Sequence, residues 1–168
     1  MSQENLTRPE WDLWFLRLAY VYAQRGSCRR KRVGAIIVDD QHRVISAGYN
    51  GAPSGMPDCL EAGCDVRMID GRESCVRTLH AESNALDYVG RGALDAIMYT
   101  TIIPCRLCAL RIVQAGIRTV RFHEYYESQG SKETAEVLKS GGVALEHYVA
   151  PLWLVDSFGY HETPHVRP

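Results

Sequence analysis

The chain has 168 residues, of which 46% are hydrophobic and 23% charged, and 19 basic against 20 acidic residues leave a formal net charge of -1. This size and composition are typical of one globular domain with a hydrophobic core, and they exclude a disordered tail protein. The balanced charge argues against duplex nucleic acid as a partner, because such binding usually requires a strongly basic surface.

The sequence contains no membrane or export signal that we recognise. No stretch reaches the roughly 18–20 uninterrupted apolar residues of a transmembrane helix, and residues 1–10 are polar rather than basic and then apolar. We therefore expect a cytoplasmic protein with no membrane partner. Disulfides are uncommon in that compartment, so we interpret the six cysteines first as metal ligands or catalytic thiols.

The first half of the chain predicts one helix and one β-hairpin. Residues 7–10 have the form of a capping box with Thr7 as the N-cap, and the apolar residues after it recur every three or four positions to about Gln24. Residues 33–38 and 43–49 are short β-branched runs that predict two antiparallel strands. Residues 50–79 show no sustained periodicity, and an unordered loop of this length needs a function or a staple.

Helices and strands alternate in the second half. We expect helices at about 80–89, capped by Thr78, at 104–115, ended by Gly116, and at 132–139. The strands between and after them are expected at 95–101, 120–123 and 143–149. This order predicts an α/β fold in which helices sandwich a mixed five-stranded sheet, with parallel pairing where helices connect the later strands.

Two short motifs point to a catalytic metal. Cys105 and Cys108 lie one turn apart at the start of a predicted helix, and His80 opens the preceding helix. Three protein ligands leave one position open, as in catalytic zinc sites, and Glu82 lies close enough to His80 to move a proton there. The alternative is two core thiols and a histidine that caps a helix. Both motifs in this order, however, form the zinc deaminase signature.

With these motifs the chain resembles the deoxycytidylate (dCMP) deaminase family of the cytidine deaminase superfamily. The resemblance covers about residues 10–150, which we interpret as the catalytic core of a single domain over 1–168, with 151–168 as a C-terminal extension. It rests on residues 32–38, 48–53, 80–85, 104–108 and 115–117. Residues 48–53 would alone be an ordinary turn, but tRNA adenosine and riboflavin-pathway deaminases usually lack this stretch.

The resemblance implies a cytidine deaminase-like three-layer α/β/α sandwich and the hydrolytic deamination of dCMP to dUMP, which supplies thymidylate synthesis. Zinc would activate water, and Glu82 would move the protons. The resemblance also implies that Asn50 binds the deoxyribose, that the backbone N–H of Ala81 binds the base carbonyl, and that Tyr126 packs near the nucleotide. Asn84 is expected on the sugar-phosphate side.

Regulation is a further implication of the resemblance. Relatives with this motif set are often hexamers that dCTP activates and dTTP inhibits, so we expect a homo-oligomer with such effectors and Mg²⁺ accompanying the triphosphate. The expected effector or phosphate residues are Arg32, Gly48, Tyr49 and Gly51. Residues 25–32 also carry five basic side chains, which are either a solvated face or an anion pocket.

Four more cysteines lie outside the catalytic motif, namely Cys28, Cys59, Cys64 and Cys75. Three of them fall in the segment 50–79, so a second, structural zinc with four thiolates would close this segment onto the end of the first helix. Several members of the resembled family have a second zinc here with differing ligands. The alternative is four unpaired thiols, because the spacing is not that of a compact zinc knuckle.

Two other functions compete with dCMP deamination. One is deamination of another base or nucleotide, such as a 5-substituted dCMP, CMP or tRNA adenosine. The balanced charge argues against tRNA, which calls for a basic stripe. The other is a non-catalytic module, stapled by zinc, that binds nucleotides. Glu82 argues against it, since a silent module has no use for a carboxylate beside the metal.

Overall fold

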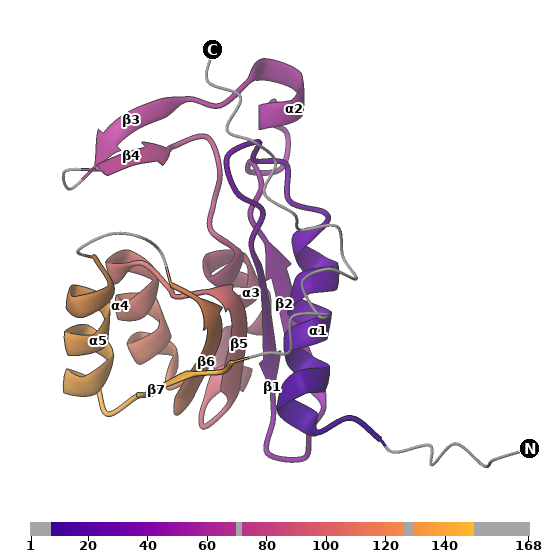
Figure 1. Cartoon of the computed structure of the whole chain (residues 1–168), viewed down its shortest axis with the longest axis vertical. Coiled ribbons are helices and arrows are strands. Elements are labelled where there is room, and N and C mark those ends of the chain that lie inside the picture. The colour runs from indigo at the N-terminus through magenta and orange to yellow at the C-terminus, as the bar shows by residue number, and fades with distance from the viewer. Residues whose placement is uncertain (1–7, 70–71, 126–129, 150–168) are drawn as a thin grey trace, which may run out of the picture.

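A computed structural model describes residues 8–69, 72–125 and 130–149. Its central feature is a five-stranded sheet with the strand order β2-β1-β5-β6-β7. Helices lie on both faces of this sheet (Figure 1), so the expected three-layer α/β/α fold is confirmed. Among the residues described, no helix combines the length and the apolar character needed to cross a bilayer.

The first helix and the hairpin follow the prediction closely. Helix α1 spans Trp11–Ala23, and strands β1 (Gly34–Val38) and β2 (Val44–Tyr49) pair antiparallel as expected. The predicted start of the helix is wrong. Glu10 is the N-cap with an extended backbone, and its carbonyl accepts the first helical hydrogen bond, so it cannot be the third helical residue of a capping box. Thr7 lies outside the described residues.

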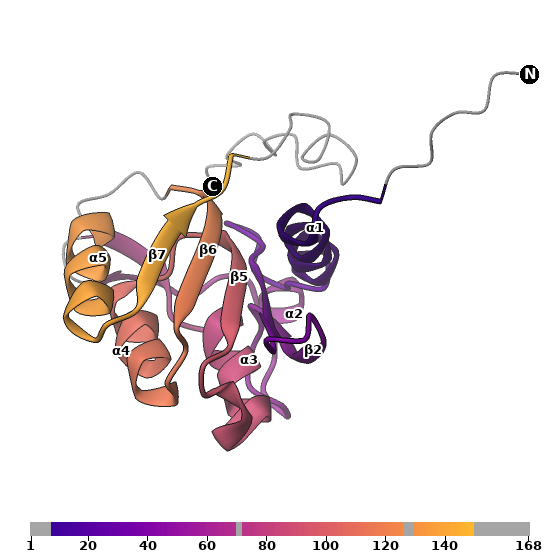
Figure 2. The same cartoon turned by 90° about the horizontal axis from the view of Figure 1, so that it is seen from below.

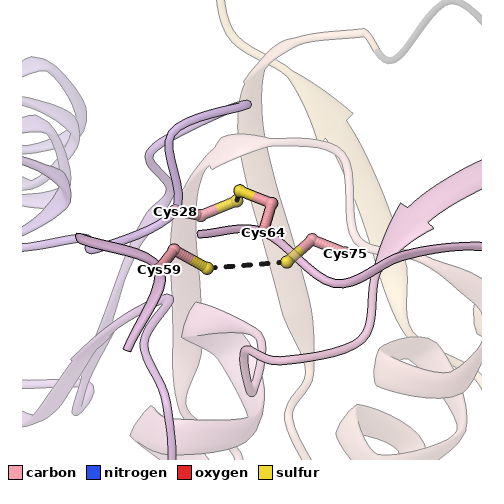
Figure 3. Close-up of side chains that lie close together, drawn as sticks. All are labelled: Cys28, Cys59, Cys64 and Cys75. Carbon is pink, nitrogen blue, oxygen red and sulfur yellow. Dashed lines mark hydrogen bonds between the residues drawn. The ribbon is translucent and has the colours of Figure 1, made fainter. Parts of the chain in front are cut away.

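The segment 50–79, expected to be a loop that needs a function or a staple, contains a short helix and short strands in its described residues, 50–69 and 72–79. It contains helix α2 (Cys59–Ala62) and the strands β3 (Val66–Ile69) and β4 (Arg72–Cys75), which pair as a separate antiparallel hairpin. Asp58 caps α2 by accepting hydrogen bonds from the two backbone N–H groups of Leu60 and Glu61. Elements of four residues are too short to produce a periodicity. The segment brings three of its cysteines to Cys28 (Figure 3).

The remaining elements alternate as predicted. They are α3 (Ala81–Val89), a 3₁₀ turn η1 (Gly90–Ala93), β5 (Ile97–Ile102), α4 (Arg106–Ala115), β6 (Thr119–Glu124), α5 (Gly130–Ser140) and β7 (Ala144–His147). Parallel pairing of β5 with β6 and of β6 with β7 is confirmed. Gly116 ends α4 in the left-handed conformation, also as predicted. Thr78 is not a cap, since His80 is the N-cap of α3.

Alternating strand residues build a separate apolar layer on each face of the sheet. Helix α1 covers one face, and α3, α4 and α5 cover the other (Figure 2). The layer under α1 includes Phe15, Ala19, Ile36, Val38, Ile97 and Tyr99. The layer under the other helices includes Ala35, Ile37, Ala85, Met98, Ala109, Ile112, Val120 and Leu138. The elements that carry the metal motifs therefore pack on a single face.

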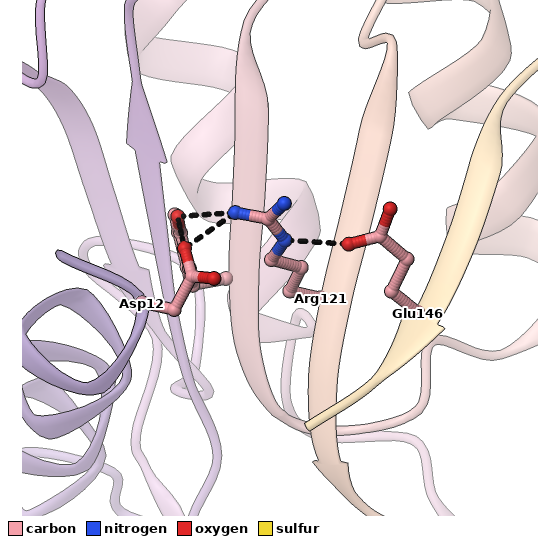
Figure 4. A network of polar contacts seen from close by, with 4 residues as sticks. Asp12, Arg121 and Glu146 are labelled. Atoms are coloured by element: carbon pink, nitrogen blue, oxygen red, sulfur yellow. Dashed lines mark hydrogen bonds and ion pairs between the residues drawn. The ribbon is translucent and has the colours of Figure 1, made fainter. Parts of the chain in front are cut away.

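A polar network joins α1 to strands β5, β6 and β7 on the face of the sheet that α1 covers. Arg121 of β6 donates to Asp12 of α1, to the hydroxyl of Tyr99 at 3.1 Å and to Glu146 Oε2 of β7 at 2.6 Å (Figure 4). Tyr99 in turn donates to Asp12 over 2.7 Å. One guanidinium thus ties three strands to the helix, which fixes α1 relative to the parallel part of the sheet.

Candidate active site

Three ligand atoms meet where α3 and α4 begin. Nδ1 of His80 lies 3.4 Å from Sγ of Cys105 and 3.5 Å from Sγ of Cys108. Tetrahedral zinc, with bonds of about 2.3 Å to sulfur and about 2.0–2.1 Å to nitrogen, places such ligands about 3.6 Å apart. The donor set therefore fits a zinc ion, and the three residues predicted from the sequence do lie together.

Local structure explains why these side chains converge. His80 and Cys105 are the N-cap residues of α3 and α4, and Cys108 lies in the first turn of α4, where its N–H donates to Cys105 Sγ. The positive ends of both helix dipoles face the thiols and favour their charged form. Hydrogen bonds from Cys108 and His80 hold the pKa of Cys105 well below its usual range, which favours the thiolate, the form that binds a metal.

Glu82 lies in the first turn of α3 and lines the same cleft as His80 and Cys105. Only 4% of its surface is exposed, and this burial raises the pKa of its carboxyl group. A carboxyl whose pKa is moved toward neutrality can both accept and release a proton. The position and environment of Glu82 are those required of a proton shuttle.

A cleft of about 120 Å³ lies beside these residues and is open to solvent. Five parts of the chain form its walls: the segment after α1, the end of β2, strand β4 with its continuation into α3, the segment from the end of β5 to the start of α4, and the start of α5. Its lining residues are Cys28, Arg30, Lys31, Val33, Asn50, Glu73, Ser74, Cys75, Thr78, His80, Ala81, Glu82, Ile102, Ile103, Pro104, Cys105 and Ser131.

Of the residues that the resemblance assigned to substrate binding, some line the cleft and others do not. Asn50 and Ala81 line the cleft, as expected for substrate contacts. Asn84 is not among the lining residues, and its side-chain nitrogen donates to the carbonyl of Tyr49 at 2.7 Å. Asn84 therefore connects α3 to β2. The expected place on the sugar-phosphate side did not predict this bond. Tyr126 lies outside the described residues.

Three of the predicted effector residues, Gly48, Tyr49 and Gly51, make contacts within the fold. In the part of the chain that the structure describes, none of Arg32, Gly48, Tyr49 and Gly51 lines the cleft. Gly51 pairs through its backbone with Leu79, and Tyr49 lies beside Gly51. Gly48 is buried against α3, where a Cβ atom would lie 2.3 Å from the carbonyl oxygen of Ala81 and 2.5 Å from the backbone nitrogen of Ala85. A glycine here lets α3 approach the sheet.

We expect Gly48→Ala to destabilise the fold by about 1–3 kcal/mol or more, because the new methyl group meets backbone atoms that cannot turn aside. The displaced α3 carries His80 and Glu82, so the activity of the folded variant should fall as well. Thermal unfolding followed by circular dichroism measures the first effect. Gly92→Ala is the matched control, since a Cβ there meets only Val89 Cγ2 at 3.5 Å. Equal stability of the two variants would contradict the prediction.

A second cluster consists of the four remaining cysteines. Sγ of Cys59 lies 3.6 Å from Sγ of Cys75, and Sγ of Cys28 lies 3.9 Å from Sγ of Cys64 (Figure 3). All four sulfur atoms lie within 4.8 Å of one another. Tetrahedral zinc with bonds of about 2.3 Å places its sulfur ligands about 3.8 Å apart, so four thiolates here fit a closed structural site. The geometry agrees with the set of four predicted from the sequence.

Sequence reasoning did not find the acidic and hydroxyl groups that β4 brings to the cleft. Glu73 and Ser74 lie in β4 and line the cleft. Neither belongs to a motif, and the pairing of β3 with β4 that places them there carried no periodic signal. The basic run gave the only hint, because Arg30 forms an ion pair with Glu73 at 3.2 Å.

Comparison with known proteins identifies the family. Residues 9–124 match the model of the cytidine and deoxycytidylate deaminase zinc-binding region. The chain belongs to this family. The match spans both motifs of the cytidine and deoxycytidylate deaminases, His80 to Glu82 and Cys105 to Cys108, which form the metal centre described above.

Two relatives illustrate how the chain compares with other members of this family. It is 40% identical over 126 residues to a deoxycytidylate deaminase of Mycobacterium phage D29, a match that covers 68% of this chain and 95% of the phage protein. It is 38% identical over 155 residues to a deoxycytidylate deaminase of Schizosaccharomyces pombe, covering 88% of this chain and 47% of that protein. The chain thus spans about half the length of the yeast relatives it matches.

A solved structure shows the same arrangement. The dCMP deaminase of cyanophage S-TIM5, crystallised in complex with dCMP and dUMP, superposes with a TM-score of 0.68 and 28% sequence identity. The match covers 84% of this chain and 99% of the phage protein. The sheet order and the helices around it therefore conform to the fold of a dCMP deaminase.

Proposed function

We propose that this chain catalyses the zinc-dependent hydrolytic deamination of dCMP to dUMP. The observation that carries the proposal is the buried Glu82 beside three convergent metal ligands in an open cleft. Membership of the family and the deoxycytidylate deaminases among the relatives support it. The complex of the S-TIM5 neighbour with dCMP and dUMP supports the choice of a mononucleotide.

The chemistry divides between the metal and the protein. When bound by His80, Cys105 and Cys108, zinc supplies an activated water for attack on C4 of the base. Glu82 would take one proton from that water and pass it to N3 of the base, and it would then carry the remaining proton of the hydroxyl newly attached to C4 to the departing amine. One water is consumed and one ammonia is released for each dUMP formed. Ala81 offers its backbone N–H at the same cleft wall.

The decisive experiment follows the loss of cytosine absorbance when purified protein is incubated with dCMP. We expect turnover of dCMP and much slower turnover of deoxycytidine. A panel of dCMP, CMP, 5-methyl-dCMP, dCTP and cytidine then defines the substrate range. Preference for another member of the panel would assign a different substrate, and no turnover of any of them would favour a non-catalytic module that binds nucleotides.

A second zinc bound by Cys28, Cys59, Cys64 and Cys75 is part of the proposal. The mutual distances of the four sulfur atoms support it. Such an ion would join the segment after α1 to α2 and β4, in addition to the bonds of Arg29 to the carbonyl of Leu60 and of Arg30 to Glu73. Arg77 strengthens the same region by donating from Nε to the carbonyl of Gly63 at 2.9 Å.

The remaining expectations stay predictions. They are a single domain over residues 1–168, assembly into a homo-oligomer such as a hexamer, regulation by dCTP and dTTP with Mg²⁺ on the triphosphate, and a cytoplasmic location. All of the predicted effector residues, Arg32, Gly48, Tyr49 and Gly51, lie outside the lining of the cleft. An effector bound through them would therefore occupy a different surface from the substrate.

A further inference from the structure

The two thiols of the metal centre, Cys105 and Cys108, belong to the start of α4, which packs between two other helices. Helix α3 lies on one side of α4 and α5 on the other (Figure 2). Each of these neighbours directs one buried hydroxyl group toward the start of α4, Ser83 from α3 and Thr134 from α5. Neither residue is one of the expected ligands, substrate contacts or proton carriers.

Ser83 contacts the buried ligand Cys108 directly. Its hydroxyl oxygen lies 3.7 Å from Sγ of Cys108, and the two residues are only 8% and 2% exposed. A thiolate has no proton to donate, whereas a serine hydroxyl can donate as well as accept. When Cys108 is the thiolate that a metal requires, the hydroxyl is therefore the donor. Its hydrogen bond holds the sulfur in one orientation and withdraws electron density from it.

Thr134 acts on Cys105 through the backbone. The carbonyl of Cys105 accepts a hydrogen bond of α4 from the N–H of Ala109 at 2.9 Å, and the buried carbonyl of Pro104 precedes it, outside the helix. Thr134 is fully buried, and its Oγ1 donates to the Pro104 carbonyl at 2.9 Å. This carbonyl belongs to the peptide group that joins Pro104 to Cys105, so the bond fixes the backbone from which the ligand side chain extends.

The same short segment is also held from the sheet. The N–H of Ile103 donates to the carbonyl of Glu124, the last residue of β6, at 2.9 Å. Cys105 itself is only partly buried, in contrast to Cys108, so packing restrains its side chain less. Backbone bonds from β6 and α5 therefore have the larger share in placing Cys105.

We propose that Ser83 and Thr134 are positioning residues of the zinc centre, which hold Cys108 and Cys105 in the arrangement that the metal requires. The inference rests on the proposed function, because it adds supporting groups to the same ligands. Groups that bond to metal ligands fix the orientation of those ligands and tune the metal. The centre then depends on α5 as well, although the sequence of this helix contains neither histidine nor cysteine.

Cadmium NMR tests the contact made by Ser83. When an NMR-active cadmium isotope replaces zinc, each site gives its own resonance, because the chemical shift depends on the number and the bonding of the sulfur ligands. We expect Ser83→Ala to shift the resonance of the centre formed by His80, Cys105 and Cys108. A resonance of the four-cysteine cluster should stay in place and serves as the internal control. An unmoved resonance of the first centre would overturn the role of Ser83.

Zinc affinity tests the contact made by Thr134. Thr134→Val keeps the shape of the side chain but removes the hydroxyl, and we expect it to lower the affinity of the first centre for zinc by about 10- to 100-fold. Competition with a chromogenic chelator measures this affinity. Thr134→Ser, which keeps the hydroxyl, should retain the affinity of the wild type.

Thr100→Val is the matched control for this variant. Thr100 is also fully buried, and its hydroxyl donates to the carbonyl of Ile102 at 3.0 Å within β5. This change should lower the melting temperature to a similar extent without a loss of zinc affinity. Equal zinc affinities of Thr134→Val and Thr100→Val would make Thr134 a purely structural residue and overturn its role.

Failure of the proposed function can be distinguished from failure of this inference. If wild-type protein binds no zinc through His80, Cys105 and Cys108, the proposed function fails and the positioning roles with it. If wild-type protein binds zinc there and deaminates dCMP, but Ser83→Ala and Thr134→Val show the cadmium spectrum and the zinc affinity of the wild type, the positioning roles alone are overturned.

Discussion

Replacing Glu82 with Gln is expected to lower kcat for dCMP by about 100- to 10,000-fold, the usual contribution of a general acid–base group. The carboxyl lies in the first turn of α3, almost fully buried, at the cleft wall that also carries His80 and Cys105. An amide of the same shape cannot accept the proton of the attacking water. It also removes the need to bury a charge, so the variant should be at least as stable as the wild type.

Steady-state rates and elemental analysis of the same samples distinguish a Glu82 that transfers protons from a Glu82 that binds zinc. The variant should keep the zinc content of the wild type, because Glu82 is not among the convergent ligands. Glu136→Gln, an exposed change on α5, should have no effect on the rate. Normal turnover by Glu82→Gln would contradict the assigned mechanism, and a parallel loss of zinc would make Glu82 a ligand.

Replacing Cys59 with Ser is expected to reduce the zinc content from two ions per chain to one and to destabilise the fold by at least about 3 kcal/mol. Structural zinc contributes to folding free energy directly, and a loss of this size lowers the melting temperature by roughly 6–12 °C in a chain of this length. Cys59 is fully buried, with its sulfur 3.6 Å from that of Cys75. An unliganded hydroxyl there leaves three thiolates facing one another.

Cys105→Ser provides the comparison for this variant. Both should lose one zinc ion, but Cys105→Ser should lose all activity with a smaller loss of stability. Cys59→Ser should instead keep its catalytic zinc and a measurable kcat. A wild-type ratio near one zinc per chain would overturn the second site, and identical behaviour of the two variants would show that the clusters do not act separately.

The metal centre was predictable because its ligands coincide with strong local signals. Cys105 directly follows Pro104 after the end of β5, and His80 precedes a helix that Gly90 ends. Each of the two metal-binding motifs therefore lies at the start of a predictable helix. The alternation of helices and strands brings both helices to the same face of the sheet. The strands and the left-handed Gly116 followed from the same kind of local pattern.

The outer wall of the cleft could not be predicted in this way. Strands β3 and β4 are four residues long, and the partners that place them are distant in sequence, as Arg30 is from Glu73. Lys31 and Glu124 are likewise brought together only by the tertiary fold. For the same reason the sequence did not predict that the side chain of Asn50 bonds the backbone on both sides of Arg32.

The direction of the strands has a consequence for how the substrate range of such a domain can change. Strand β1 runs antiparallel to β5, so the N-terminal end of β1 and the C-terminal end of β5 lie at the same end of the sheet. Val33 and Ile103, which flank these strands, both line the cleft. Insertions or substitutions in the loops at this end of the sheet can change the shape of the cleft while the strand register and the metal ligands stay in place. New substrate specificities can therefore arise on the same fold.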